Sequence, residues 1–348
     1  MLRTACSERS CAPVVPLGWR RGSLHLGLFL LSGVLSACTE GDVAPKAPVA
    51  QIVGGVGETL GRFRRPRAVA VDPASGRFYV VDRTGRVQQF EPDGTPRLEW
   101  YMPEYEHGQP VGIVVEEGGT VLINDSHYGR LVRFSADGDK ILNQWGSTGL
   151  EPGQFTFGRD VTVDSVGNIY AGDYGNSNDR IQKFSRDGSF LQTWGRRGVG
   201  PGEFQRPQGM VIERYDGAEW LLVADCANHR IQRFTLEGVF VSMFGSVGFA
   251  AGEMRYPSSV VVASDATLLV SEWGNNRVQR FDREGHSLGF WGTAGRDVGE
   301  LATPWDIAVG PDGRFFVVDY DNHRLQVFRW PLEIADRERG GVGRGGEL

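Results

Sequence analysis

The feature that most constrains this chain is a short pattern that recurs six times: Arg, an aliphatic residue, two variable residues and Phe. The copies are RVQQF (86–90), RLVRF (130–134), RIQKF (180–184), RIQRF (230–234), RVQRF (277–281) and RLQVF (324–328). Successive Phe residues are 44, 50, 50, 47 and 47 positions apart. A period of this size indicates one supersecondary unit per repeat, and units that cannot bury their apolar faces alone stack on their neighbours.

Each repeat has the pattern of four short strands. An apolar run ends in an acidic residue shortly before the repeated Arg, as in LLVAD (221–225), and an earlier apolar run precedes it, as in AVAVD (68–72). An Asp-Gly or Glu-Gly turn follows the Phe in five repeats, and a last strand ends in an aromatic residue, as at Trp145-Gly146. Short strands joined by tight turns predict a four-stranded antiparallel sheet. Six such sheets predict an all-β fold, a six-bladed β-propeller.

The sixth repeat lacks a last strand of its own. Residues 50–54 (AQIVG) match the last-strand pattern of residues 142–146 (LNQWG) and precede the first repeat. We therefore expect this N-terminal strand to complete the sixth blade and close the ring, which would remove an open sheet edge.

The repeat resembles a known family. The motif Asp-x-x-Asn-x-Arg-aliphatic-x-x-Phe, seen in ADCANHRIQRF (224–234) and VDYDNHRLQVF (318–328), is similar to the NHL repeat, although the first two repeats lack the Asn. The resemblance covers residues 50–330 and implies one NHL-type six-bladed propeller over residues 49–331. It implies no particular activity.

The N-terminal segment is typical of a secretory signal. Arg20 and Arg21 precede a short apolar run (24–37) that ends in Leu-Ser-Ala-Cys38, which resembles the bacterial lipobox. That resemblance implies acylation of Cys38, for example with palmitate; an ordinary or a twin-arginine signal peptide is the alternative. We expect a signal peptide (1–37), a flexible tether (38–48), a disordered tail (332–348), and a lipid-anchored protein of the cell envelope. It would face the periplasm from the outer membrane or lie at the cell surface.

Charge and cysteine content exclude some function classes. The formal net charge is −6, and it becomes −9 without residues 1–37, which hold four arginines and one glutamate. An acidic protein is a poor partner for nucleic acid, so we expect no nucleic-acid binding. Cys226 is the one cysteine within the repeats, and no Cys/His cluster has zinc-site spacing. We expect no metal, no cofactor and a monomer.

The charged residues that repeat are interpreted as framework. Because the acid and the Arg recur in all six repeats, we expect them to pair within each blade and fix the turn between its second and third strands. His229 and His323 stand at the variable position after the motif Asn and are interpreted as motif positions rather than ligands. Cys226 is interpreted as a structural thiol.

Function is expected from the residues that do not repeat. Since strands alternate in direction, the start of each first strand and the turn between the second and third strands share one face, here called the mouth face. Asp160 and Asp306 occupy equivalent positions three blades apart and should face each other across the channel. The candidate ligand-binding residues on this face are Arg67, Arg83, Arg159, Asp160, Tyr174, Gln208, Trp273, Trp305, Asp306 and Tyr320.

These residues favour a non-catalytic interaction module of the envelope that binds a protein, peptide or glycan, because Arg and aromatic side chains dominate binding hot spots. The alternative is a propeller enzyme, a lyase or hydrolase. The chain resembles the peptidyl-α-hydroxyglycine α-amidating lyases in repeat style, and that family implies zinc-binding His residues after a Pro at first-strand starts. Here the corresponding residues are Arg67, Val111, Gln208, Ser258 and Trp305.

Overall fold

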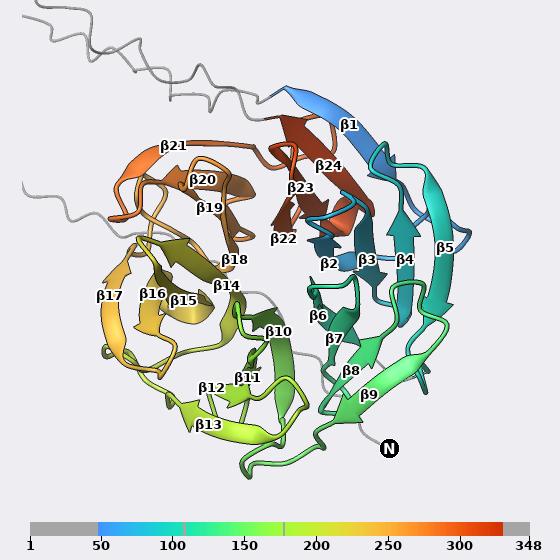
Figure 1. The fold of residues 1–348 in the computed structure, drawn as a ribbon. Coiled ribbons are helices and arrows are strands. Elements are labelled where there is room, and N and C mark those ends of the chain that lie inside the picture. The colour runs from blue at the N-terminus through green and yellow to red at the C-terminus, as the bar shows by residue number, and fades with distance from the viewer. Residues whose placement is uncertain (1–47, 107–108, 177, 330–348) are drawn as a thin grey trace, which may run out of the picture. The chain divides into compact units, whose positions relative to one another are not determined.

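A computed structural model describes residues 48–329 apart from 107–108 and 177. Within this part of the chain, 24 strands form six four-stranded antiparallel sheets around a central channel (Figure 1). The expected six-bladed propeller is therefore confirmed. The expected signal peptide, the acylated Cys38, the tether up to residue 47 and the tail lie outside the described residues. No helix in the described part is long and apolar enough to cross a bilayer.

The blades follow one another along the chain, each running from the channel outward. Blade 1 holds β2 (Pro66–Val71), β3 (Phe78–Asp82), β4 (Arg86–Phe90) and β5 (Pro96–Tyr101). Blade 2 holds β6 (Pro110–Val115), β7 (Val121–Asp125), β8 (Arg130–Phe134) and β9 (Ile141–Trp145). Blade 3 holds β10 (Phe157–Val163), β11 (Ile169–Tyr174), β12 (Arg180–Phe184) and β13 (Phe190–Trp194).

The second half of the ring continues the same order. Blade 4 holds β14 (Pro207–Tyr215), β15 (Ala218–Asp225), β16 (Arg230–Thr235) and β17 (Phe240–Phe244). Blade 5 holds β18 (Pro257–Val262), β19 (Leu268–Glu272), β20 (Arg277–Phe281) and β21 (Ser287–Trp291). Blade 6 holds β22 (Pro304–Val309), β23 (Arg314–Asp319), β24 (Arg324–Arg329) and β1 (Val49–Gly54). Short 3-10 turns, η1 (Cys226–Asn228) and η2 (Tyr320–Asn322), join the second and third strands of blades 4 and 6.

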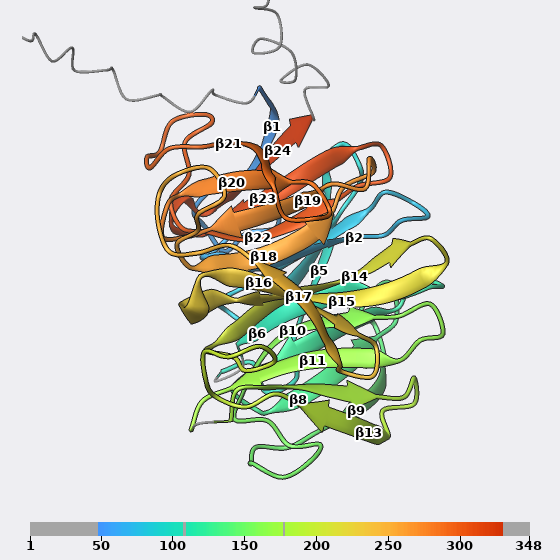
Figure 2. The ribbon, with the colours of Figure 1, turned by 90° about the vertical axis from the view of Figure 1, so that its left-hand side faces the viewer.

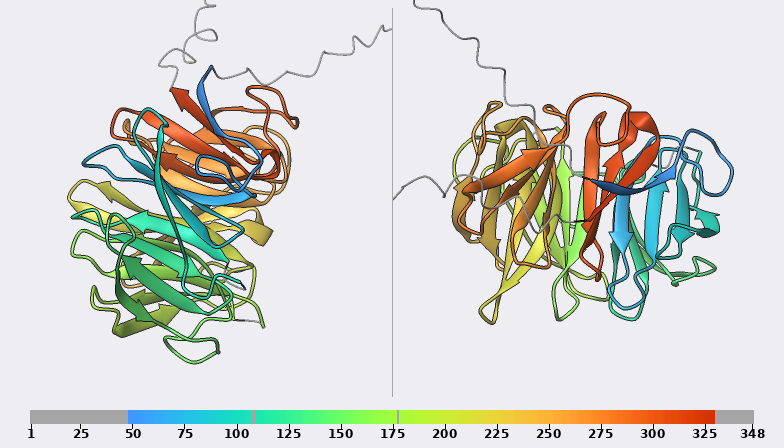
Figure 3. Two further views of the ribbon diagram at one scale, coloured as in Figure 1. Left: turned by 90° about the vertical axis from the view of Figure 1, so that its right-hand side faces the viewer. Right: turned by 90° about the horizontal axis from the view of Figure 1, so that it is seen from above.

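Ring closure occurs as the sequence predicts. The N-terminal β1 pairs antiparallel with β24, so that Ile52 lies opposite Gln326 and Val53 lies opposite Leu325. Figure 3 shows β1, in blue, beside the red strands of blade 6. The sixth sheet is thus built from both ends of the propeller.

The core lies between blades. Six clusters of buried apolar side chains each join two neighbouring blades, one for every interface of the ring. Between blades 1 and 2, for example, Tyr79 and Val81 pack with Ile123 and Phe134. Figure 2 shows the sheets of blades 5, 4 and 3 stacked face to face. Stacking therefore buries the faces that a single blade would expose.

The turn glycine between the third and fourth strands also serves this packing. Gly188 adopts φ +92°, and a Cβ there would lie 2.7 Å from the Trp145 ring of the preceding blade. Glycine is needed both for the left-handed backbone and for the close approach of the indole.

The repeated acid and Arg form the expected framework in all six blades. In blade 4, the Arg230 Nε donates to the fully buried Asp225 carboxylate at 2.8 Å. Asp225 also accepts the backbone N–H of Gln205, and Arg230 donates to the carbonyls of Val199 and Glu203. The ion pair therefore ties the turn between the second and third strands to the loop that enters the same blade.

Candidate functional site

A β-bulge occurs at the same place in the innermost strand of every blade. The register with the second strand shifts between Pro66 and Ala68, Pro110 and Gly112, Gly158 and Val161, Pro207 and Met210, Pro257 and Ser259, and Pro304 and Ile307. A bulge leaves its extra residues out of the ladder and re-aims their side chains. Here the bulges re-aim them toward the channel.

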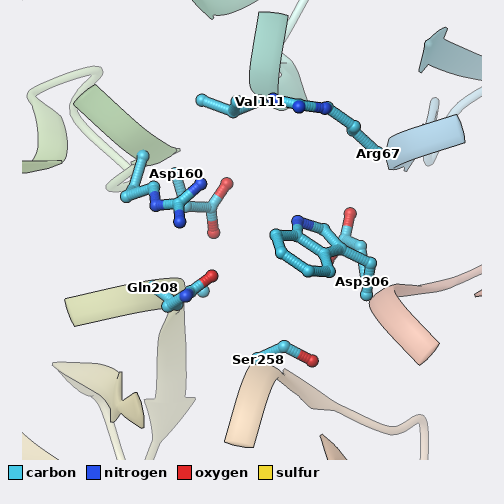
Figure 4. A pocket seen from close by; sticks show the side chains of 9 residues that line it. Arg67, Val111, Asp160, Gln208, Ser258 and Asp306 are labelled. Carbon is cyan, nitrogen blue, oxygen red and sulfur yellow. The ribbon is translucent and has the colours of Figure 1, made fainter. Parts of the chain in front are cut away.

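The bulge residues line one pocket at the mouth face. Its walls are Arg67, Val111, Arg159, Asp160, Gln208, Gly209, Ser258, Trp305 and Asp306, which are the residues between the paired positions of the six bulges. The pocket encloses about 270 Å³ of empty space, including part of its open mouth. Figure 4 shows the labelled side chains reaching the opening from six separate strands. The site is therefore a product of the ring, with every blade contributing.

The two channel carboxylates brace neighbouring blades. The Asp160 Oδ2 accepts the backbone N–H of Met210 in blade 4 at 2.7 Å, and the Asp306 Oδ2 accepts that of Val69 in blade 1 at 2.9 Å. Both side chains line the mouth pocket and also a larger space of about 730 Å³ farther along the channel, whose other lining residues are mainly aliphatic. They therefore mark the waist between the two spaces.

Burial alters the acidity of both channel carboxyls. Desolvation raises the pKa of Asp160 well above its usual range, and the negative charge of Asp306 raises it further. Desolvation also raises the pKa of Asp306, to about 6, although hydrogen bonds from Val69 and Ser259 oppose that rise. The charge of Asp306 thus acts on Asp160, although the two residues lie three blades apart in the sequence.

Arginine and aromatic side chains interleave above the waist. The Arg159 guanidinium lies 4.8 Å from the ring centre of Tyr174 and 5.9 Å from that of Trp305. Trp305 stacks on Tyr320 with 5.2 Å between ring centres. Such contacts place cations over aromatic faces, which is a favourable arrangement. Together they make one packed layer of charged and aromatic groups around the opening.

The arginines of this layer have no acidic partner. Two other arginines beside the mouth, Arg64 and Arg65, do form ion pairs. Among the described residues, no ion pair involves Arg67, Arg83, Arg159 or Arg206. Desolvation lowers the pKa of Arg67, and the positive charge of Arg83 lowers it further. Desolvation likewise lowers the pKa of Arg159, to which the charge of Arg67 also contributes. A guanidinium nevertheless stays charged in proteins, so these four arginines bring positive charge to the mouth without forming an ion pair.

The structure brings most of the predicted site residues together. Arg67, Arg159, Asp160, Gln208, Trp305 and Asp306 line the pocket. Tyr174 and Tyr320 contact that group, and Arg83 lies near Arg67. Trp273 stacks on Tyr256, with 4.4 Å between ring centres. Their role in binding a ligand stays a prediction.

The sequence does not predict two residues at the mouth, Arg206 and Tyr256. Each precedes the proline that begins an inner strand, and each adopts a left-handed backbone, with φ +58° and +54°. Arg65 and Thr303 share this conformation at the same position. Because a residue before proline normally adopts an extended backbone, no simple rule predicts where these side chains point. Their recurrence beside the proline is the one signal that could have found them.

The motif histidines hold neighbouring blades together. The Nδ1 of His229 accepts the backbone N–H of Tyr256, and the Nδ1 of His323 accepts that of Arg65, each at 3.0 Å. Asn276 fills the same role toward Thr303. The variable position after the motif Asn is therefore an inter-blade hydrogen-bond acceptor, which explains why His and Asn both occur there.

Cys226 lies in η1 with 1% of its surface exposed. Burial raises the pKa of its thiol to about 11, so it stays protonated at neutral pH. A protonated thiol is a weak nucleophile, which agrees with the structural interpretation. Among the described residues, no three His, Cys, Asp or Glu side chains gather as a possible metal site.

Sequence comparisons identify the repeat. The model of the NHL repeat matches residues 301–328. The chain is 33% identical to NHL repeat-containing protein 3 of Mus musculus in an alignment of 172 residues, which covers 46% of this chain and 49% of that protein. The Homo sapiens protein of the same name is 30% identical over the same length. This chain is a β-propeller that carries an NHL repeat. It spans about half the length of the curated relatives it matches.

Solved structures share the propeller fold at low identity. A gluconolactonase from Xanthomonas campestris superposes with a TM-score of 0.59 at 17% identity, over 83% of this chain and 98% of that one. A streptogramin B lyase superposes with a TM-score of 0.56 at 14% identity, over 79% and 96%. The virginiamycin B lyase of Staphylococcus aureus superposes with a TM-score of 0.55 at 15% identity, over 81% and 89%. At these identities the likeness shows the fold alone.

Proposed function

We propose that this NHL-repeat propeller is a non-catalytic binding module whose protein, peptide or glycan ligand docks on the mouth face. The observation that carries the proposal is the layer of arginines without acidic partners, interleaved with aromatic rings around the pocket. Positive charge with no partner in the protein attracts acidic groups, and Arg, Trp and Tyr are the residues that most often dominate binding energy.

The other groups at the site favour binding over catalysis. Each channel carboxylate already accepts a backbone N–H of the next blade. The buried Cys226 thiol keeps its proton at neutral pH. The first-strand positions that hold zinc-binding His in the amidating lyases carry other residues here, among them Arg67 and Trp305. The chemistry of these groups therefore supports recognition of a ligand rather than its conversion.

Site-directed photo-crosslinking tests the docking face. A photoreactive side chain replaces Arg83, which is exposed in a turn of the mouth face. The control position is Val166, 72% exposed in the turn between β10 and β11 at the opposite end of those strands. In cells we expect a discrete adduct from position 83 only, and its loss when Trp305 and Tyr320 are both replaced by Ala. Equal adducts from both positions, or an adduct that survives the double replacement, would contradict the assignment.

We further propose that acylation of Cys38 holds the module in the cell envelope. The lipobox-like sequence before Cys38 supports this anchor. Growth with an alkyne analogue of palmitate should label the wild-type protein and not Cys38→Ser. Labelling that persists in Cys38→Ser would place the modification elsewhere.

A further inference from the structure

Resting on the proposed function, we infer that the mouth pocket binds the free C-terminal carboxylate of a peptide or protein. This pocket lies between the six bulges. Three observations carry this inference: unpaired donors in the wall, arginines that form no ion pair, and aromatic faces that are already covered.

The pocket wall contains buried hydrogen-bond donors without acceptors. The Nε atoms of Arg67 and Arg159 and the Nε2 of Gln208 are buried and have no hydrogen-bond partner. Arg159 is 9% exposed and Gln208 is 4% exposed, and both line the pocket. Buried polar atoms in native proteins are nearly always paired, because an unpaired one costs about 1–3 kcal/mol. The unpaired atoms at this pocket are therefore ready for a ligand.

The chemistry of these atoms selects the ligand group. All three are nitrogen donors, and two belong to guanidinium groups, whose planar fork matches a carboxylate. The two pocket carboxylates, Asp160 and Asp306, each direct an oxygen to a backbone N–H of the next blade. A ligand group that only accepts hydrogen bonds could pair with these three donors.

The size and cover of the site favour a chain end over a sugar ring. The pocket encloses only about 270 Å³, part of which is its open mouth, so that it has room for a small end group rather than for a chain passing through. Trp305 stacks on Tyr320, and the Tyr174 ring lies beneath both Arg159 and Arg206. A sugar ring needs an open aromatic face, whereas a peptide end can lie against ring edges while its last carbonyl oxygens accept hydrogen bonds from the same donors.

A peptide library with two end groups tests this inference. The folded propeller is titrated with fluorescent pentapeptides of random sequence that end in a free carboxylate, and with the matched library ending in an amide. Charge-assisted hydrogen bonds to a carboxylate change affinity by about ten- to a hundredfold. We expect binding, measured by fluorescence polarisation, to be weaker by that factor for the amides.

The variants locate the effect. Gln208→Glu is nearly isosteric and replaces a free donor by a negative charge, so it should abolish binding of the free acids. Arg159→Lys keeps the charge without the fork and should weaken binding. Arg196→Gln removes an arginine whose side chain is 80% exposed in a mouth-face loop, and it should have little effect. A thermal melt of each variant verifies folding.

Several outcomes would overturn the inference. Equal binding of acids and amides would exclude the carboxylate, and binding of polygalacturonate oligomers without peptide binding would identify a glycan acid instead. Binding that Gln208→Glu leaves intact would exclude the pocket. In each case the adduct from position 83 would still report whether the mouth face binds a ligand, so the two proposals fail separately.

Discussion

Replacing Asp306 by Asn should stabilise the propeller at neutral pH and leave its stability unchanged in acid. Burial raises the pKa of this carboxyl from its ordinary value of 3.8 to about 6. The folded state then holds the proton of Asp306 more tightly than the unfolded state does. The contribution of this carboxyl to the free energy of unfolding is therefore fully present below about pH 4 and is lost as the pH rises through about 6. A pKa that differs by about two between the folded and unfolded states changes the free energy of unfolding by about 3 kcal/mol.

The substitution removes that cost while keeping the contact. An Asn side chain is neutral at every pH, and its Oδ1 can still accept the backbone N–H of Val69. Urea unfolding of both proteins between pH 4 and 8 should show Asp306→Asn more stable by about 3 kcal/mol at pH 8, with the gap closing near pH 4. Exposed Asp139→Asn is the matched control and should show no such trend. A gap that does not change with pH would refute the account of the buried carboxyl.

Two further substitutions probe the contacts between blades. Gly112→Ala would place a Cβ 2.6 Å from backbone atoms of blade 3 and should lower the free energy of unfolding by about 1–3 kcal/mol, whereas at Gly172 the nearest atom is 3.7 Å away and Ala should be neutral or slightly stabilising. Urea titration measures both, and a tolerated Gly112→Ala would count against the tight bulge packing. His229→Asn should retain stability because Asn276 fills this position in blade 5, but His229→Leu should cost about 1–3 kcal/mol by leaving the Tyr256 N–H unpaired. Similar melting temperatures for the two His229 variants would contradict that role.

The repeat pattern predicts much of the fold because every blade forms the same contacts between residues at equivalent positions of its repeat. The acid and the Arg that pair in every blade are five residues apart in most repeats, as in Asp225 and Arg230, so local sequence suffices to find them. The ring closure is equally visible, since residues 50–54 look like a last strand with no blade of their own. Alternation of strand direction was enough to gather most candidate residues on one face.

The details of the site depend on strand register and on contacts between blades, which no local sequence pattern predicts. The bulges add one or two residues to each inner strand, and which residues leave the ladder depends on register with the second strand. The partner of Asp160 is a backbone N–H in the next blade, fifty residues away. The left-handed backbone of Arg206 runs against the usual preference before proline. These features arise only when the blades are assembled.

The pairing of β1 with β24 has a consequence for how the protein is made. The ribosome synthesises β1 first and its partner last, so the first strand waits while all the other blades emerge, on the order of tens of seconds at ordinary synthesis rates. Until then the ring cannot shut, and a chain that stops anywhere before Arg324–Arg329 leaves β1 without a partner. Such a chain would present unpaired strand edges to chaperones and proteases. The final strand pair thus distinguishes complete chains from incomplete ones.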